Sequence, residues 1–403
     1  MPLKGFKLGK VELILDQIIH LTIFPRKNGR PICPLCGKKD STYDTQKPRT
    51  WRHLSCFKYH ILIEFAPRRV QCKHCHTVVT EAIPWSIGKC HLTKPLLYQL
   101  ALWARELSWS QVARLFEVDW SQVKTAVASA VQFGLKQRDT SEVLLIGIDE
   151  ISRQKGHKYL TQVYEIAEGK KRLLWSGKDR SEDTLRKFFH FWGEERSKKL
   201  LGICCDMWNP YIKVIREFAP QAVIVFDKFH IVRHLNNAVD EVRRKEAAEL
   251  QKQGNRILNK TRYIWLKNPE NLTAKQKILF HQLAAKDLKT LRAYELKRAF
   301  QLFWDCPDRK SAEIYFQQWF NWSTHSKLEQ FQELAWRLYL EKEQILSYFS
   351  LPITNNAVEG MNNKAKVIMR RSYGFHTTEN CILSLMHCMG KLDLPDFDPQ
   401  IHK

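Results

Sequence analysis

The sequence predicts a protein of the mixed α/β class, and the middle of the chain carries the pattern. Residues 143–149, 159–166 and 171–177 have the apolar or alternating, β-rich composition of strands. Two more apolar segments, residues 200–206 and 222–227, each follow a stretch with helical periodicity. Because parallel strands need helical crossovers, the order of three strands, helix, strand, helix and strand predicts a mixed sheet.

Helical patterns lie on both sides of this sheet region. Three short helices are predicted between residues 94 and 133, and the last two have the spacing of a helix-turn-helix, with a plain helical hairpin as the alternative. After Asp227 the pattern stays helical to about Phe349, which predicts a large all-α insertion. Residues 1–30 are expected to form a helical or mixed basic arm.

The charge of the chain favours a polyanionic partner. Its 403 residues include 65 basic and 42 acidic side chains, which gives a formal net charge of +23. Binding a polyanion releases condensed counterions, and this favours association with a basic protein. Charge alone does not separate DNA from RNA, from an anionic membrane, or from a basic protein without such a partner.

The N-terminal segment and the cysteines point to a cytosolic protein. Residues 11–19 are interrupted by Glu12 and Asp16 and do not resemble the apolar part of a signal peptide. No segment approaches the roughly 20 apolar residues of a membrane span, so we expect no membrane association. In the cytosol, the 11 cysteines are expected to be thiols or metal ligands and not disulfides.

Two C-x-x-C pairs predict one structural zinc ion. Cys33 and Cys36 form the first pair, and Cys72 and Cys75 form the second. Four thiolates at this spacing match tetrahedral zinc, and the alternative is two unrelated pairs of reduced cysteines. Basic residues that could contact DNA phosphates surround the pairs: Lys38, Lys39, Arg49, Arg52, Arg68 and Arg69.

The start of the third predicted helix carries further candidates for DNA contact. Ser121, Gln122, Lys124 and Thr125 are expected to point outward from a recognition helix. We assign Gln122 and Lys124 to DNA binding.

Three acidic residues are candidates for a catalytic metal site. Asp149 and Asp206 each end an apolar strand, and Glu359 lies near the start of a late helix. If the first strand pairs with the fourth, the two aspartates lie side by side. Carboxylates are the ligands that Mg²⁺ prefers, and two such ions can clamp the attacking and leaving oxygens of a phosphodiester. A lone aspartate at a strand end is more often a turn or cap residue. Asp227 ends the fifth, outer strand and is ranked below Asp206.

The Glu359 helix also presents a basic stripe. Lys364, Lys366, Arg370 and Arg371 follow the glutamate without an intervening acid. Side chains three or four residues apart share a helix face, so these cations are expected to hold DNA next to the glutamate. A solvated basic helix is the alternative.

Four blocks in this order resemble the DDE transposases of bacterial insertion sequences, and in particular the zinc-knuckle-bearing insertion sequence L-three group. The blocks are Gly147–Ser152, Cys205–Tyr211, Phe226–Val232 and Asn355–Gly360. The resemblance covers about residues 30–390. It implies a ribonuclease-H-like catalytic domain with an α-helical insertion, two Mg²⁺ or Mn²⁺ ions per active site, and Asp149, Asp206 and Glu359 as their catalytic ligands.

The resemblance also implies the domain order and the function. The expected domains are a basic arm with a zinc module (1–90), a helix-turn-helix (91–140), a catalytic domain (141–230 and 351–403) and the insertion (231–350). The protein is expected to bind the terminal inverted repeats of its element, cleave DNA, join it to target DNA, and act as at least a dimer on DNA, associated with the nucleoid. The alternatives are an inactive DNA-binding regulator derived from a transposase and a structure-selective nuclease.

Overall fold

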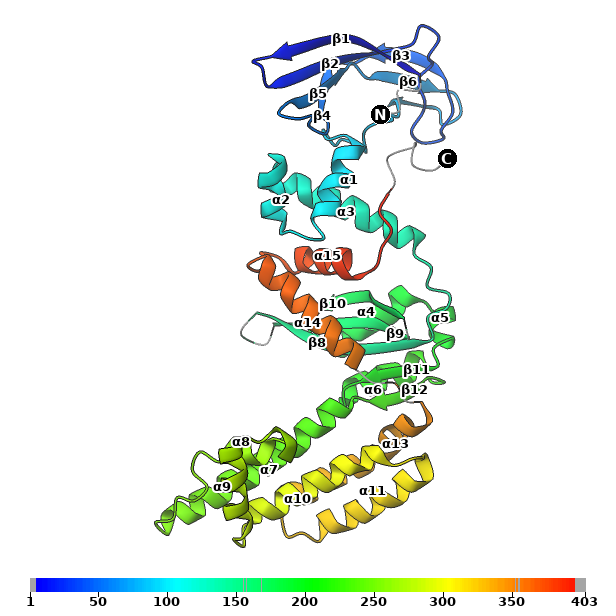
Figure 1. Cartoon of the computed structure of the whole chain (residues 1–403). Coiled ribbons are helices and arrows are strands. Elements are labelled where there is room, and N and C mark those ends of the chain that lie inside the picture. Colours follow the sequence, from blue (N-terminus) through cyan, green and yellow to red (C-terminus); the bar gives the residue numbers. More distant parts are fainter. Residues whose placement is uncertain are drawn as a thin grey trace. The chain divides into compact units, whose positions relative to one another are not determined.

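The computed structural model describes residues 5–395, except residues 155, 157, 168, 352, 354 and 355. The chain divides into two compact units, Met1–Asp139 with Val367–Lys403 and Thr140–Lys366 (Figure 1). The predicted α/β class is confirmed. Among the described residues, no helix combines the length and the apolar composition that crossing a bilayer requires.

The first unit begins with strands, so the helical or mixed arm predicted for residues 1–30 is wrong. β1 (Phe6–Ile14) and β2 (Ile18–Pro25) form an antiparallel hairpin. They continue into β5 (His60–Phe65) and β4 (Arg49–Arg52), in the order β1-β2-β5-β4. Most side chains of β1 are exposed, and a bulge between Leu8 and Val11 interrupts its alternation of apolar residues, which weakens the strand pattern in the sequence. The hairpin is held by a core cluster of Phe6, Ile23, Trp51, Ile63, Phe65 and Trp85.

A second small sheet carries the cysteine pairs. Its strands are β3 (Ser41–Thr45), β6 (Arg68–Cys72) and β7 (Thr77–Thr80), in the order β3-β6-β7. Buried Val70 packs there against Cys33 and Cys72. This core is small, so a metal ion held by the four cysteines would add a further constraint on the sheet.

The helices of the first unit follow the predicted positions closely. α1 (Lys94–Trp103), α2 (Trp109–Phe116) and α3 (Trp120–Gln137) are separated by short turns. Capping boxes at Ser108 and Asp119 begin α2 and α3. α15 (Thr378–Met389) packs against α3 in the same unit, although residues 351–403 were expected to belong to the catalytic domain.

The second unit contains the predicted five-stranded sheet. Its strands are β8 (Leu145–Gln154), β9 (Lys158–Ala167), β10 (Lys170–Lys178), β11 (Gly202–Cys205) and β12 (Val223–Phe226). The order is β10-β9-β8-β11-β12. The first three strands are antiparallel, while β8, β11 and β12 run parallel. The prediction of a mixed sheet is confirmed.

Amphipathic helices cover one face of this sheet. They are α4 (Glu182–Trp192), which starts at the predicted cap Ser181, and α6 (Asn209–Phe218), with the short α5 (Glu194–Lys198) between α4 and β11. Apolar residues from the helices and strands form one core cluster, which includes Ile146, Ile148, Leu185, Phe188, Ile203 and Ile215. Burying apolar side chains of this size stabilises the fold by roughly 1.5–3 kcal/mol each. Because Ile146 and Ile148 of β8 pack in this cluster, Asp149 lies on the opposite face of the sheet.

The region after β12 is helical, as its pattern predicts (Figure 1, green to orange). It consists of α7 (Lys228–Lys252), α8 (Arg262–Leu266), α9 (Ala274–Ala284), α10 (Lys289–Leu302), α11 (Arg309–Thr324), α12 (Glu329–Leu340) and α13 (Lys342–Ser350), with 3₁₀ turns at Pro269–Asn271 and Phe303–Asp305. Buried Glu246 accepts hydrogen bonds from the backbone N–H groups of Lys289 and Thr290, both at 2.7 Å. This carboxylate therefore caps α10 from the neighbouring helix.

Candidate active site and metal centres

Two aspartates lie side by side at one edge of the second unit's sheet. Asp149 is on β8, and Asp206 directly follows β11. In the parallel pairing of these strands Cys204 is opposite Gly147, so Asp206 is level with Asp149 two residues later. The prediction that the first and fourth strands pair is confirmed.

His230 is the third member of this cluster. One ligand atom each from Asp149, Asp206 and His230 lie within 4.8 Å of one another. His230 is in the first turn of α7, whose start is fixed by the Asp227 carboxylate accepting a 3.1 Å hydrogen bond from the Phe229 N–H. The histidine Nε2 lies 2.9 Å from Asp206 Oδ1 and 3.6 Å from Asp227 Oδ2. Asp227 thus serves as a helix cap beside the cluster.

Glu359 lies on α14 (Asn356–Arg371), and its side chain is exposed. It is not part of the three-residue cluster. The same helix nevertheless touches that cluster, because Asn362 Nδ2 donates a 2.5 Å hydrogen bond to Asp149 Oδ2. Glu359 is three residues earlier and shares this helix face. The residues Thr354 and Asn355, which open the glutamate block, lie outside the described residues.

The donor set of the cluster suits a divalent cation. Asp206 Oδ1 is buried, and no donor among the described residues meets it in hydrogen-bond geometry, although His230 Nε2 is 2.9 Å away. Neighbouring ligands of an octahedral Mg²⁺ ion lie about 3 Å apart, given its bond length of about 2.1 Å. Burial, reinforced by the nearby Asp206 charge, raises the pKa of Asp149 to about 6. A bound cation would stabilise these crowded carboxylates.

A second charged group lies behind Asp206. Glu150, the neighbour of Asp149 in β8, is largely buried, and its carboxylate is 3.1 Å from Arg180 Nε. Arg180 Nη2 lies 3.5 Å from Asp206 Oδ2, and its guanidinium stacks over the Trp208 ring at 4.5 Å. Burial and the Asp206 charge raise the pKa of Glu150 to about 7. Arg180 is therefore placed to hold Asp206, a role that its sequence context did not suggest.

The four predicted zinc ligands are brought together in the first unit. One sulfur each from Cys33, Cys36, Cys72 and Cys75 lie within 4.8 Å of one another. The Sγ atoms of Cys36 and Cys72 are 3.6 Å apart, close to the separation of about 3.8 Å for two sulfurs on a tetrahedral zinc ion. Gly37, with φ of +72°, provides the left-handed turn that closes the first pair.

Two of the four thiols have pKa values shifted in opposite directions. Burial raises the pKa of Cys33, but the backbone N–H groups of Cys36 and Leu35 outweigh it and lower the pKa to about 7. Hydrogen bonding to neighbouring thiols, from Cys36 first, raises the pKa of Cys75 to about 12. A zinc ion would replace the retained protons and make all four ligands thiolates.

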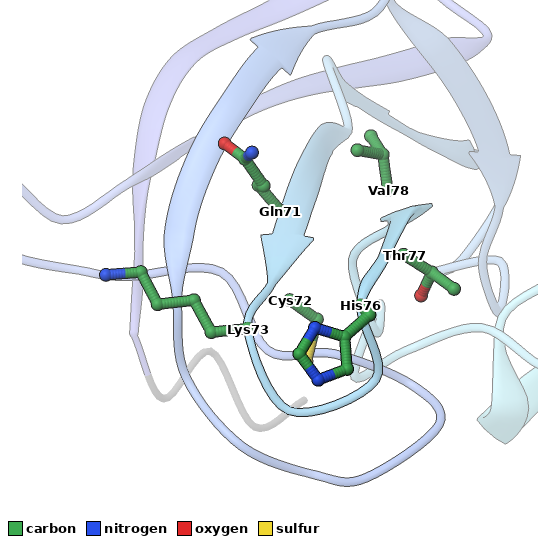
Figure 2. Close-up of a pocket in the computed structure, with 6 residues that line it drawn as sticks. All are labelled: Gln71, Cys72, Lys73, His76, Thr77 and Val78. Carbon is green, nitrogen blue, oxygen red and sulfur yellow. The ribbon is translucent and has the colours of Figure 1, made fainter.

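A pocket of about 420 Å³ lies next to the second cysteine pair on the β6–β7 hairpin (Figure 2). Its lining residues are Gln71, Cys72, Lys73, His76, Thr77 and Val78. Figure 2 shows the His76 ring in front of Cys72, with Gln71 on one strand and Thr77 at the start of the other. The exposed polar side chains make this hairpin suitable for a polar partner, while the four cysteines suffice as metal ligands without His76.

The predicted DNA-binding residues of the first unit differ in whether their side chains are already bonded within the fold. Arg68 forms a bidentate pair with Glu81 and also donates to the Gly29 carbonyl. Arg69 is paired with the Asp44 carboxylate. Gln122 accepts a hydrogen bond from the Asp119 N–H in the capping box of α3. Lys124 is exposed and forms no ion pair with any residue that the structure describes, so it is the better placed of these for a contact with DNA.

The predicted basic stripe on α14 is mostly exposed. Lys364, Lys366 and Arg370 are solvent-accessible, whereas Arg371 donates to the backbone carbonyls of Arg105 and Glu106 at 2.9 and 2.7 Å. Arg371 therefore has a role within the fold of the first unit.

An acidic cluster at the ends of two neighbouring parallel strands, a four-cysteine module and a strongly basic chain together are typical of enzymes that act on nucleic acids. The comparisons with known proteins agree. Residues 146–385 match the ISL3-type family model described as transposase, and residues 29–75 match the zinc finger of the transposases of IS204, IS1001, IS1096 and IS1165.

Similar proteins extend this match over nearly the whole chain. The transposase for insertion sequence element IS1001 of Bordetella parapertussis is 27% identical over 386 residues, which is 95% of each chain. The transposase for insertion sequence element IS1557 of Mycobacterium tuberculosis is 28% identical over 380 residues, or 88% of this chain and 84% of the relative. The chain therefore belongs to the ISL3 family of transposases.

Proposed function

We propose that this protein is a DDE-type DNA transposase that cleaves the ends of an insertion sequence and joins them to target DNA. The second unit then acts as a ribonuclease-H-like catalytic domain, interrupted by the all-α insertion. The observation that carries the proposal is the position of Asp149 and Asp206 on neighbouring parallel strands, with the Glu359 helix hydrogen-bonded to Asp149.

Asp149, Asp206 and Glu359 would hold two Mg²⁺ or Mn²⁺ ions, with His230 available as a further ligand. Such ions supply Lewis-acid stabilisation of the charge that develops on the attacking and leaving oxygens of the phosphodiester. Asp149 contacts both other parts of the site: a ligand atom of it lies within 4.8 Å of one of Asp206, and its Oδ2 accepts the Asn362 amide of the Glu359 helix. Arg180 lies next to Asp206 Oδ2, while His230 lies next to Oδ1, so the Asp206 carboxylate would be oriented before DNA binds.

The strand-transfer reaction would proceed in two steps on this site. A water molecule attacks the phosphodiester at the element end and releases a strand with a free 3′-hydroxyl. That hydroxyl then attacks a phosphodiester of the target DNA in line with the leaving oxygen and displaces a target 3′-hydroxyl, so this second step forms one phosphodiester bond for the one that it breaks. The exposed cations Lys364, Lys366 and Arg370 on the Glu359 helix would hold the flanking phosphates.

Recognition of the terminal inverted repeats is assigned to the first unit. The zinc module and α2–α3, acting as a helix-turn-helix, would bind the duplex, with exposed Lys124 near the start of α3 among the contacts. Because two ends must be brought together, the active species on DNA is at least a dimer.

The test is strand transfer by the purified full-length chain. A duplex carrying the element end and a supercoiled target plasmid are incubated with Mg²⁺, and joined products are separated on a gel. The proposal requires joined product that depends on the end sequence and disappears with a chelator. Cleavage of branched DNA regardless of end sequence would instead show a structure-selective nuclease, and end-specific binding without cleavage would show a regulator.

A further inference from the structure

A buried hydrogen-bond chain connects the sheet, the Glu359 helix and the first aspartate. The hydroxyl of Tyr164 donates to Asn362 Oδ1 at 2.8 Å, and Asn362 Nδ2 donates to Asp149 Oδ2 at 2.5 Å. Tyr164 is 0% exposed and Asn362 is 5% exposed. An ionised carboxylate only accepts hydrogen bonds, so it fixes the orientation of the amide, whose oxygen then faces the tyrosine hydroxyl.

The strand register explains how Tyr164 reaches this position. Tyr164 on β9 is paired with Gly147 on β8, two residues before Asp149. Residues two apart on a strand share a face, and directly paired residues of neighbouring strands also share one. The tyrosine therefore lies on the same face as Asp149. Because Gly147 has no side chain, the ring can lie over β8 and direct its hydroxyl toward Asn362.

Both oxygens of Asp149 are held by donors from this chain. Oδ1 accepts the Glu150 N–H at 2.7 Å, and Oδ2 accepts the Asn362 amide. Two donors in different directions fix the plane of the carboxylate and leave the remaining lone pairs for other ligands. The same contact fixes α14 at a point one helical turn after Glu359, so it also sets where Glu359 stands relative to Asp149.

We propose that Asn362 is a positioning residue of the active site, and that Tyr164 acts through it. Asn362 orients Asp149 for the divalent metal and holds the Glu359 helix in register with the sheet. This inference rests on the proposed function, because it assigns the metal to Asp149. Residues that orient metal ligands from behind typically change metal affinity or activity by 10–100-fold when removed.

The test is Mn²⁺ binding to the full-length, DNA-free protein, followed by electron paramagnetic resonance of the unbound ion. We expect Asn362→Ala to weaken Mn²⁺ binding by about 10-fold. Tyr164→Phe keeps the ring and removes only the hydroxyl, so a smaller loss in the same direction is expected. The double variant should bind no more weakly than Asn362→Ala alone, because the tyrosine acts through the amide.

Matched controls remove the same groups elsewhere in the second unit. Asn321→Ala deletes an exposed amide on α11, and Tyr294→Phe deletes a buried hydroxyl on α10. Both should bind Mn²⁺ as the wild type does. Thermal unfolding of each variant shows whether a loss of Mn²⁺ affinity comes from a disordered carboxylate or from a destabilised fold. If Asn362→Ala loses its fold, Tyr164→Phe decides the matter by the same measurement.

Mn²⁺ binding and DNA cleavage together distinguish an error in the proposed function from an error in the positioning role of Asn362. Wild-type protein that binds no Mn²⁺ and cleaves no element-end DNA would overturn the proposed function itself. A wild type that binds Mn²⁺ and cleaves, together with a folded Asn362→Ala of unchanged Mn²⁺ affinity, would overturn only the positioning role. If Tyr164→Phe keeps the wild-type Mn²⁺ affinity while Asn362→Ala binds Mn²⁺ more weakly, Tyr164 has no part in positioning Asp149.

Discussion

His230 Nε2 and Asp206 Oδ1 are 2.9 Å apart, although they come from the start of a helix and the end of a strand. Asp227 produces this contact, because its capping of α7 places His230 one turn into the helix and next to the sheet edge. Burial alone would lower the pKa of His230, but Asp206, Asp227 and Asp149 outweigh it and raise the pKa. Without a metal, the imidazole is thus held by the same carboxylates that a cation would bind.

Replacing His230 should therefore weaken metal binding. We expect His230→Ala to reduce Mn²⁺ affinity and the rate of end cleavage by about 10-fold or more, since it removes a nitrogen donor from the cluster. His281→Ala, an exposed histidine on α9, is the matched control. Both quantities are measured on the same preparations. A His230→Ala protein with wild-type Mn²⁺ affinity would exclude the histidine as a ligand.

The cysteine cluster should hold one zinc ion per chain. Cys33→Ser is expected to lose this zinc and the order of the β3-β6-β7 sheet, because Val70 and the cysteines form its only cluster among the described residues. Cys56→Ser, which changes an exposed thiol, should keep the metal. Elemental analysis with circular dichroism checks both variants. Folded, DNA-binding protein that contains no zinc would contradict a structural role.

Two basic residues of the first unit should behave differently on substitution. Lys124→Ala should weaken DNA binding modestly for all sequences and reduce the salt slope by about one, as expected for one lost phosphate contact. Arg68→Ala should instead reduce the free energy of unfolding by about 3–5 kcal/mol, because it leaves the buried Glu81 carboxylate unpaired. Salt-dependent binding and urea unfolding distinguish the two. A stable Arg68→Ala protein with a lower salt slope would reverse this assignment.

The insertion contains a buried lysine that should make stability depend on pH. Lys297 is 0% exposed and donates to the Trp265 and Leu266 carbonyls at 2.8 and 3.2 Å. Burial, with a smaller effect of Arg298, lowers its pKa from 10.5 to about 7. Between these values the unfolded chain binds more protons than the folded one, so stability rises with pH.

Comparison with Lys297→Met isolates this effect from other titrating groups. From pH 7 to pH 9, the wild type should gain free energy of unfolding relative to the variant, whereas below about pH 7 the difference should stay constant. Urea unfolding at each pH gives the values. A wild-type-to-variant difference that is the same at pH 7 and pH 9 would show that Lys297 stays charged in the fold.

The sequence was sufficient to place the strands that carry the aspartates. The segments ending at Asp149 and Asp206 are apolar because most of the residues that lead up to the two aspartates are buried, and such runs are distinctive. β1 and β2 escaped prediction for a different reason: most side chains of β1 are exposed, and a bulge between Leu8 and Val11 interrupts its apolar alternation.

The sequence did not predict which groups surround the aspartates, although His230 lies in the block Phe226–Val232. Asn362 lies 213 residues from Asp149, and only the packing of α14 brings the two together. The position of the His230 side chain is set by the direction of α7 after the sheet, and that of Arg180 by the turn before α4. Local patterns report burial and periodicity, but these contacts are set by the tertiary structure.

The most direct test of the proposed chemistry is cleavage of a labelled element-end duplex in Mg²⁺ by the amide variants Asp149→Asn, Asp206→Asn and Glu359→Gln. An amide keeps the size of the side chain but removes the charge that holds a divalent metal. Each variant should lose cleavage while binding the duplex as tightly as the wild type, and Asp227→Asn should be milder. Full cleavage by Glu359→Gln, or by Asp206→Asn alongside an inactive Asp227→Asn, would contradict the assignment of the three carboxylates.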